Sequence, residues 1–310
     1  MQEVTRHAYR RFLDPQVLAR LGRLDLMARH AVEGFMAGLH KSPFHGFSSE
    51  FSEHRQYMPG DPMKFLDWRV LARSDRLYLK RFEDETNLQA YVLLDCSGTM
   101  AYGDDMSKWT YARMVAASLC HVLLGQRDAV GLALFDHKVR RWIPPRSSGG
   151  HLDALLVEMS RQEAGEITDP TLALHNIAER ARRRGLVILI SDLLLPPTPG
   201  MSTSEMVARW VSVLKHFRHQ GHDVIVFHVL HPDEIDFGFS GPVEFEGLEG
   251  EDPLLVDTGS IRHVYREQVG RYLDLLQHEC RNNRVDYHRL TTSDQLDLAL
   301  SSCLDKRRRL

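Results

Sequence analysis

Apolar runs and helix-like patterns alternate along the chain from residue 89 onward. Short apolar runs predict strands buried on both faces, whereas apolar residues at three- and four-residue spacing predict helices that pack on them. The predicted strands cover residues 91–94, 129–135, 139–143, 186–190, 223–230 and 285–290. The predicted helices cover residues 107–125, 151–161, 170–184, 206–220, 265–282 and 294–308. Strands joined through helices imply right-handed crossovers, so we expect an α/β fold with a doubly wound, mostly parallel sheet.

The chain before residue 87 has a different pattern. Asp14-Pro15 marks a helix start, and apolar residues at helical spacing continue to Phe35, which predicts an N-terminal helix within residues 1–40. Residues 41–86 lose the helical period and contain turn signals, so we expect a small irregular α+β module there. Its many charged side chains either form a solvated surface or make ion pairs that pin the module to the main domain. Residues 87–310 form that main domain.

One segment interrupts the alternation of strands and helices, between residues 232 and 261. Val243 and Phe245 alternate with Glu244 and Glu246, which predicts a surface hairpin or excursion. The loop that follows is acidic through residue 252. Such a run of charges is either a solvated loop or part of a surface for a partner.

The composition is that of a soluble globular protein. The 310 residues are 43% hydrophobic and 26% charged, and the formal net charge of −3 favours binding to neither nucleic acid nor a membrane surface. The four cysteines are scattered without a CxxC pair, which argues against a zinc knuckle and a disulfide framework. No signal pattern or membrane-length apolar run is present. We therefore expect a cytoplasmic protein without a transmembrane segment.

Polar side chains follow two of the predicted strands directly. One apolar run ends at Asp95, with Ser97 and Thr99 at alternate positions after it, and another ends just before Asp192. In doubly wound sheets ligands gather at the carboxyl ends of strands where the strand order reverses, so neighbouring strands would bring both carboxylates to one crevice. Thr168 precedes a predicted helix and fits the same place. Carboxylate and hydroxyl oxygens are hard ligands that suit Mg²⁺ or Ca²⁺.

These residues carry a family resemblance. Asp95-Cys96-Ser97-Gly98-Thr99-Met100 resembles the DxSxS signature of the von Willebrand factor A domain, except that Thr99 stands where serine is usual. Thr168 followed by Ala173-Leu174 is similar to the second motif of that family, and Asp192 to the third. The resemblance implies a von Willebrand A, Rossmann-like domain with a metal-ion-dependent adhesion site. In that site Mg²⁺, or Ca²⁺ or Mn²⁺ in its place, would leave one coordination position for a carboxylate of a partner protein. The implied metal ligands are Asp95, Ser97, Thr99, Thr168 and Asp192.

A second resemblance lies between Gly46 and Arg73. The run from Arg55 to Pro62, together with Asp67-Trp68, closely resembles the bacterial family called domain of unknown function 58, whose members join this segment to a von Willebrand A-like domain. Many members carry membrane helices ahead of the segment, so this chain resembles the short soluble type. Family members are often associated with MoxR-type AAA+ ATPases. The resemblance therefore implies such an ATPase or its client as the partner.

An enzyme is the competing interpretation. Asp-x-Ser-x-Thr also resembles the phosphatase loop of haloacid dehalogenases, in which the first aspartate is the nucleophile, but that family has a second aspartate where Ser97 stands. No Walker loop, HExxH or GxSxG motif is present. Asp95 should raise the thiol pKa of Cys96, which argues against a thiolate nucleophile. We predict a non-enzymatic, Mg²⁺-dependent protein-interaction adaptor, with a metal-dependent phosphohydrolase using Asp95 as the alternative.

Other polar residues are not assigned to the predicted metal site. Asp104 and Asp105 fit an exposed loop, and Lys108, near them in sequence, receives no role beyond possible contacts with local carboxylates. Three histidines near the end of the helix at 206–220 lie where the helix dipole favours cations, but no cysteine or carboxylate completes a metal-ligand set. They are His216, His219 and His222.

Overall fold

A computed structural model describes residues 49–56, 70–71, 73, 77–84, 88–165, 169–196, 200–246, 253–296 and 300. They fall into two compact units, one within Phe35–Asn87 and one from Leu88 onward. The first unit contains the antiparallel pair β1 (Ser49–Gln56) and β2 (Tyr78–Asp84). The helix predicted over 14–35 lies outside the described residues, and packing of the 41–86 module on the main domain stays a prediction.

The second unit is built on a six-stranded sheet with the order β10-β7-β6-β3-β4-β5. All neighbouring strands run parallel except β5, which is antiparallel to β4 at one edge. The strands are β3 (Gln89–Asp95), β4 (Ala129–Phe135), β5 (Val139–Arg146), β6 (Leu186–Ser191), β7 (Asp223–Leu230) and β10 (Asp286–Thr291). The doubly wound, mostly parallel α/β sheet and its edge strand are therefore confirmed.

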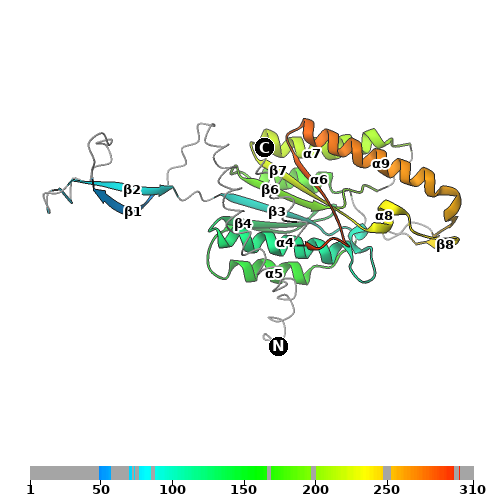
Figure 1. The fold of residues 1–310 in the computed structure, drawn as a ribbon, viewed down its shortest axis with the longest axis horizontal. Helices are drawn as coiled ribbons and strands as arrows, with labels where there is room; N and C mark the ends of the chain where they lie inside the picture. The colour runs from blue at the N-terminus through cyan, green and yellow to red at the C-terminus, as the bar shows by residue number, and fades with distance from the viewer. Residues whose placement is uncertain are drawn as a thin grey trace, which may run out of the picture. The chain divides into compact units, whose positions relative to one another are not determined.

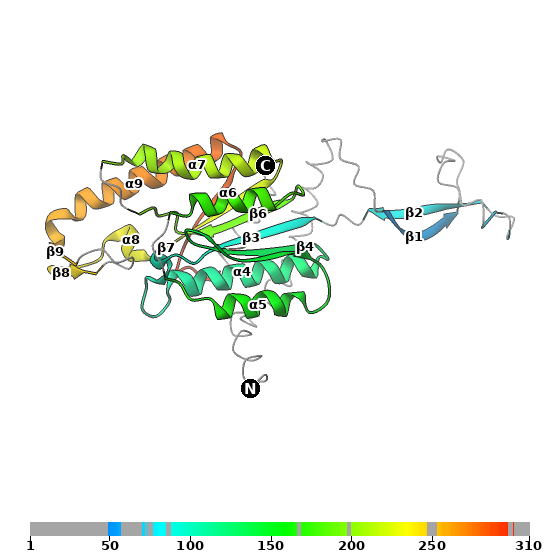
Figure 2. The same cartoon turned by 180° about the vertical axis from the view of Figure 1, so that it is seen from behind.

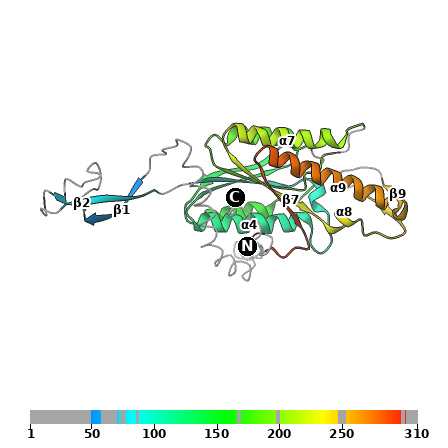
Figure 3. The same cartoon turned by 45° about the horizontal axis from the view of Figure 1, so that its top comes forward.

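Helices cover both faces of this sheet. α4 and α5 lie on one face, and α6, α7 and α9 on the other (Figures 1 and 2). α7 and α9 run side by side (Figure 3). The helices are α4 (Lys108–Gly125), α5 (His151–Arg161), α6 (Thr171–Arg180), α7 (Thr203–His219) and α9 (Thr258–Asn282). None of the helices in the described part of the chain is long and apolar enough to cross a membrane.

The core explains why the central strands are almost wholly apolar. Every residue of β6 is buried, because the strand has a neighbour on each side and helices above and below. Trp210 and Phe217 of α7 pack into the same hydrophobic cluster as Leu93 of β3 and Leu189 of β6. This packing holds the ends of β3 and β6 in a fixed relation, on which the candidate site depends.

The segment predicted as a surface excursion is more structured than expected. It contains the short helix α8 (Pro232–Asp236) and the antiparallel hairpin of β8 (Pro242–Phe245) and β9 (Leu254–Asp257). The hairpin was predicted. The predicted start of the next helix was wrong, because α9 begins at Thr258 rather than at residue 265, with Asp257 as its N-cap. Its first turns have no buried stripe, since Ile261 and Val264 are exposed.

Two other helix predictions differ from the structure. The helix expected over 170–184 ends at Arg180, where Ala181 leaves the helical conformation, although its N–H still bonds the last turn. Four arginines between 180 and 184 therefore straddle the helix end instead of extending it. Most of the helix predicted over 294–308 lies outside the described residues.

Gly185, just before β6, tests the close approach of β6 to β3. A Cβ atom there would lie 2.0 Å from the carbonyl oxygen of Gln89. We expect Gly185→Ala to lower the free energy of unfolding by about 3 kcal/mol, measured by urea denaturation. Gly270→Ala is the control, because its Cβ would meet nothing within 4 Å inside α9 and should stabilise the protein by about 0.5–1 kcal/mol. Equal stabilities for the two variants would contradict this account.

Candidate functional site

The site lies at the carboxyl ends of β3 and β6, where the strand order reverses. The chain passes from β3 to β4 on one side and later returns to β6 on the other side of β3 (Figure 2). Leu94 pairs with Ile190 in these parallel strands, so Asp95 and Ser191 follow at the same level, and Asp192 comes next. The expectation that the two aspartates meet at a switch point is confirmed.

Asp95 is buried and engaged through both carboxylate oxygens. Its Oδ1 accepts the backbone N–H of Ser97 at 2.9 Å, and its Oδ2 accepts the hydroxyl of Ser191 at 2.6 Å. Burial first, and the neighbouring Asp192 carboxylate second, raise the pKa of Asp95 to about 7, against the hydrogen bonds from Ser191 and Ser97 that lower it. Without a bound cation, Asp95 is therefore about half protonated near pH 7.

The two hydroxyls after β3 bridge the two aspartates. Ser97 and Thr99 lie where the strand gives way to a 3-10 turn at Gly98–Ala101, and their hydroxyl oxygens are 3.1 Å apart. A hydrogen bond from Ser97 lowers the pKa of Asp95, and one from Thr99 lowers that of Asp192. The structure therefore brings these four predicted site residues together. The fifth, Thr168, lies outside the described residues.

Lys108 also belongs to the site, although the sequence analysis gave it no role. Its side chain is fully buried, and Nζ lies 2.8 Å from Oδ2 of Asp192 and 2.5 Å from Oε1 of Glu234. Burial alone would lower the pKa of Lys108, but the two carboxylates outweigh it and raise that pKa. Asp192 is also buried, which would raise its pKa, yet the Lys108 ammonium brings it below the ordinary value. Lys108 and Asp192 are thus both ionised.

Glu234 connects the segment 232–261 to the site through its contact with Lys108. The prediction of a surface hairpin or excursion did not include this contact. Glu234 lies on α8, and its Oε2 accepts the N–H of His231 at 2.7 Å in a capping box. Its other oxygen meets Lys108, so one carboxylate both closes the helix start and neutralises a buried ammonium. One sequence feature could have indicated a role for Lys108. It is the first residue of α4, a mostly apolar helix that follows the Ser97–Thr99 turn.

A second set of hydrogen bonds holds the loop after β6. His228 Nε2 lies 2.7 Å from the carbonyl oxygen of Asp192, and its Nδ1 lies 2.6 Å from the hydroxyl of Tyr287. Burial lowers the pKa of His228 to about 4, so the ring is neutral and donates through Nε2 while Tyr287 donates to Nδ1. Leu193, in a left-handed conformation with φ of 52°, is held through its carbonyl by the hydroxyl of Tyr272. These contacts orient Asp192 toward β3.

The donor set suits a hard divalent cation. Two carboxylates and two hydroxyls converge, and such a set of oxygen donors is typical of Mg²⁺ sites that retain several waters. Among the residues that the structure describes, no group of three or more His, Cys, Asp or Glu side chains could hold a metal. A cation at this turn would therefore depend on the hydroxyls of Ser97 and Thr99 as well as on the two carboxylates.

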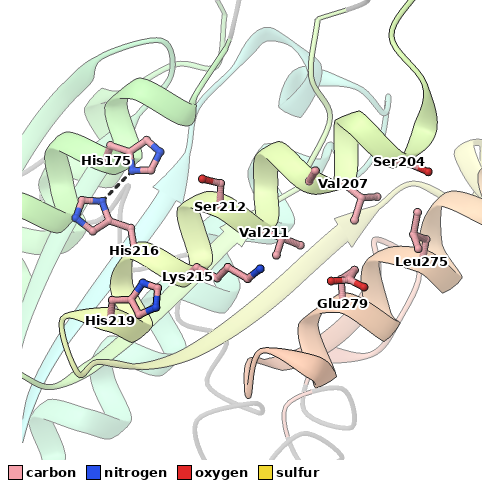
Figure 4. Close-up of a pocket in the computed structure, with 11 residues that line it drawn as sticks. His175, Ser204, Val207, Val211, Ser212, Lys215, His216, His219, Leu275 and Glu279 are labelled. Carbon is pink, nitrogen blue, oxygen red and sulfur yellow. Dashed lines mark hydrogen bonds between the residues drawn. The ribbon is translucent and has the colours of Figure 1, made fainter.

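Other candidates from the sequence lie elsewhere. Asp104 and Asp105 are exposed, as predicted. Burial first, and Asp95 second, raise the pKa of the Cys96 thiol, which supports the expectation that it is no nucleophile. The histidines near the end of α7 lie in different surroundings. His222, which follows the helix, is buried with Nε2 2.9 Å from the Ala181 carbonyl, whereas His216 of α7 lines a groove between α6, α7 and α9 (Figure 4).

Sequence comparison places this chain among related proteins. A family model described as "Protein of unknown function DUF58" matches residues 53–272. An uncharacterized protein of Mycobacterium tuberculosis is 25% identical over 240 residues, which cover 76% of this chain and 72% of that protein. The uncharacterized protein YeaD of Bacillus subtilis is 32% identical over 106 residues, covering 34% of this chain and 24% of YeaD. The family match spans more than half of the chain.

Structure comparison gives more distant similarities. The conserved hypothetical protein BatB from Bacteroides thetaiotaomicron matches 72% of this chain and 100% of that chain, at 18% identity and a TM-score of 0.44. The SpRpn10 VWA domain matches 70% of this chain and 95% of that chain, at 9% identity and a TM-score of 0.39.

Asp95→Asn tests the electrostatic state of the site. The folded pKa of Asp95, about 7, lies above its ordinary value of 3.8, so ionisation costs the folded protein stability as pH rises between these values. In EDTA, we expect Asp95→Asn to stabilise the protein at pH 8 by on the order of 2 kcal/mol, and by much less near pH 4, in thermal unfolding. Exposed Asp105→Asn is the control and should change little. The same gain at both pH values would contradict the assignment.

Proposed function

The chain belongs to the family described as Protein of unknown function DUF58, and from this premise we propose that it is a non-enzymatic adaptor that binds a partner protein through Mg²⁺. The observation that carries the proposal is the convergence of Asp95, Ser97, Thr99 and Asp192 at the switch point of the sheet. Thr168 is proposed as a further ligand on its sequence motif. Together they would form a metal-ion-dependent adhesion site.

The chain's own residues prepare this site in three ways. Ser191 and the N–H of Ser97 orient the Asp95 carboxylate, and His228 orients the backbone at Asp192. The hydroxyls of Ser97 and Thr99 supply neutral oxygen ligands, which limit the negative charge that must be buried. A bound Mg²⁺ would contribute a positive charge with an open coordination position, to which a partner's carboxylate could bind. Ca²⁺ or Mn²⁺ could occupy the same donors.

The proposed partner presents an acidic side chain and is a MoxR-type AAA+ ATPase or its client. This choice extends the resemblance to the chain's own family, with assembly or activation of other proteins as the proposed role. We propose a cytoplasmic site of action and no nucleic-acid partner, consistent with the net charge of −3. Catalysis is disfavoured because Ser97 stands where a phosphatase would need an acid. Asp95-dependent hydrolysis of a phosphate ester would replace the proposal with the phosphohydrolase alternative.

Calorimetry with Mg²⁺ tests the first step. We expect the wild-type protein to bind one Mg²⁺ and Asp95→Ala to lose at least about 90% of that affinity, because a carboxylate that binds the ion directly or through water is removed. Asp105→Ala is the matched control, since Asp105 is an exposed aspartate near the same turn. Equal Mg²⁺ binding by wild type and Asp95→Ala would refute the assignment of the site.

Pull-down with a purified MoxR-type ATPase from the same genome tests the second step. Immobilised wild type should retain the ATPase in Mg²⁺, and Asp95→Ala should not, because the partner carboxylate would have no cation to bind. The variant is a sharper test than chelation, since such ATPases need Mg²⁺ themselves. Equal retention by both proteins would show that the contact does not pass through the metal site.

A further inference from the structure

Lys108 places a fixed positive charge at the edge of the proposed metal site. Its Nζ contacts Asp192 on one side and Glu234 on the other, at 2.8 and 2.5 Å. Lys108 and Asp192 are fully buried, and only 20% of the Glu234 side chain is exposed. Solvent and salt therefore screen this charge poorly, and it acts strongly on any ion bound by Asp192.

The charge balance of the site is set by four ionisable side chains. Asp95, Asp192 and Glu234 are acidic and Lys108 is basic, so the fully ionised cluster carries a formal charge of −2. That charge matches one divalent cation. The ammonium also competes with the cation for Asp192, because both interact with the same carboxylate.

Lys108 also connects the site to α8. This helix is anchored by Glu234 at Lys108, by Tyr102 donating to Asp233 at 3.3 Å, and by Tyr265 donating to the Glu234 carbonyl at 3.0 Å. Figure 2 shows α8 beyond the carboxyl ends of the strands, next to the β8–β9 hairpin. A cation that coordinates the Asp192 carboxylate weakens the contact between that carboxylate and Lys108. The Lys108 ammonium then interacts more strongly with Glu234 of α8.

We propose that Lys108 is a built-in counter-ion that sets the divalent-cation affinity of the site and couples cation binding to α8 through Glu234. This inference rests on the proposed Mg²⁺ site and adds its regulation. In the cation-free protein Lys108 compensates the buried carboxylates, and in the cation-bound protein it shifts toward Glu234. A purely structural lysine would leave cation affinity independent of the charge at positions 108 and 234.

A charge series measured by Mg²⁺ calorimetry tests the proposal. Lys108→Met makes the cluster more negative and should tighten Mg²⁺ binding at least about tenfold, whereas Glu234→Gln makes it less negative and should weaken binding by a similar factor. The double variant Lys108→Met/Glu234→Gln restores the wild-type charge and should bring the affinity back toward the wild-type value. Asp236→Asn is the matched control, because Asp236 lies on α8 with its side chain 68% exposed and should leave affinity unchanged.

Hydrogen exchange at the backbone amides of residues 233–236 supplies a second readout, since Pro232 has no amide hydrogen. Mg²⁺ should slow exchange in α8 of the wild type and have no such effect in Glu234→Gln. If Lys108→Met does not fold, the Mg²⁺ affinity of Glu234→Gln alone tests the inference. A wild-type Mg²⁺ affinity in Glu234→Gln would overturn it.

The outcomes separate the inference from the proposed function. Mg²⁺ binding by wild type with unchanged affinity in both single variants overturns the inference and leaves the metal site intact. Binding by Lys108→Met but not by wild type supports the counter-ion role and overturns Mg²⁺ dependence of the native protein. Absence of Mg²⁺ binding in every protein of the series overturns both.

Discussion

The buried ion pair between Lys108 and Asp192 is the interaction on which the proposed site depends. Taking two charges out of water is costly, and the structure offsets that cost by adding Glu234 on one side and backbone and hydroxyl donors on the other. The pair joins α4 to the end of β6 and, through Glu234, to α8. One lysine thereby connects three segments that are distant in sequence, at the carboxyl edge of the sheet.

The rest of the fold serves to keep that edge rigid. β3 and β6 are buried neighbours in the sheet, so their ends can move little relative to each other. His228 and Tyr272, from β7 and α9, fix the carbonyls of Asp192 and Leu193. The carboxylates and hydroxyls are thus held together by the fold itself, and burial first, with the Asp192 carboxylate second, raises the pKa of Asp95 to about 7.

Much of this could be predicted from the sequence, for identifiable reasons. β4 and β7 have the predicted bounds because their apolar runs end sharply at turn residues. Asp95 and Asp192 could be found because each directly follows a buried strand. The contact between Lys108 and Glu234 could not be predicted, because the two residues lie 126 positions apart and no local sequence pattern indicates a buried ion pair. The early start of α9 was missed because its first turns face solvent on several sides.

The position of a Mn²⁺ ion in crystals of the protein, located by its anomalous scattering, tests the central claim most directly. Mn²⁺ accepts the same oxygen donors as Mg²⁺ and can be placed without ambiguity. The account predicts a peak within about 2.0–2.4 Å of the Ser97 and Thr99 hydroxyl oxygens, with Asp95 and Asp192 as direct or water-bridged ligands. Full Mn²⁺ occupancy elsewhere, with Lys108 and Asp192 paired and no peak at this edge of the sheet, would contradict it.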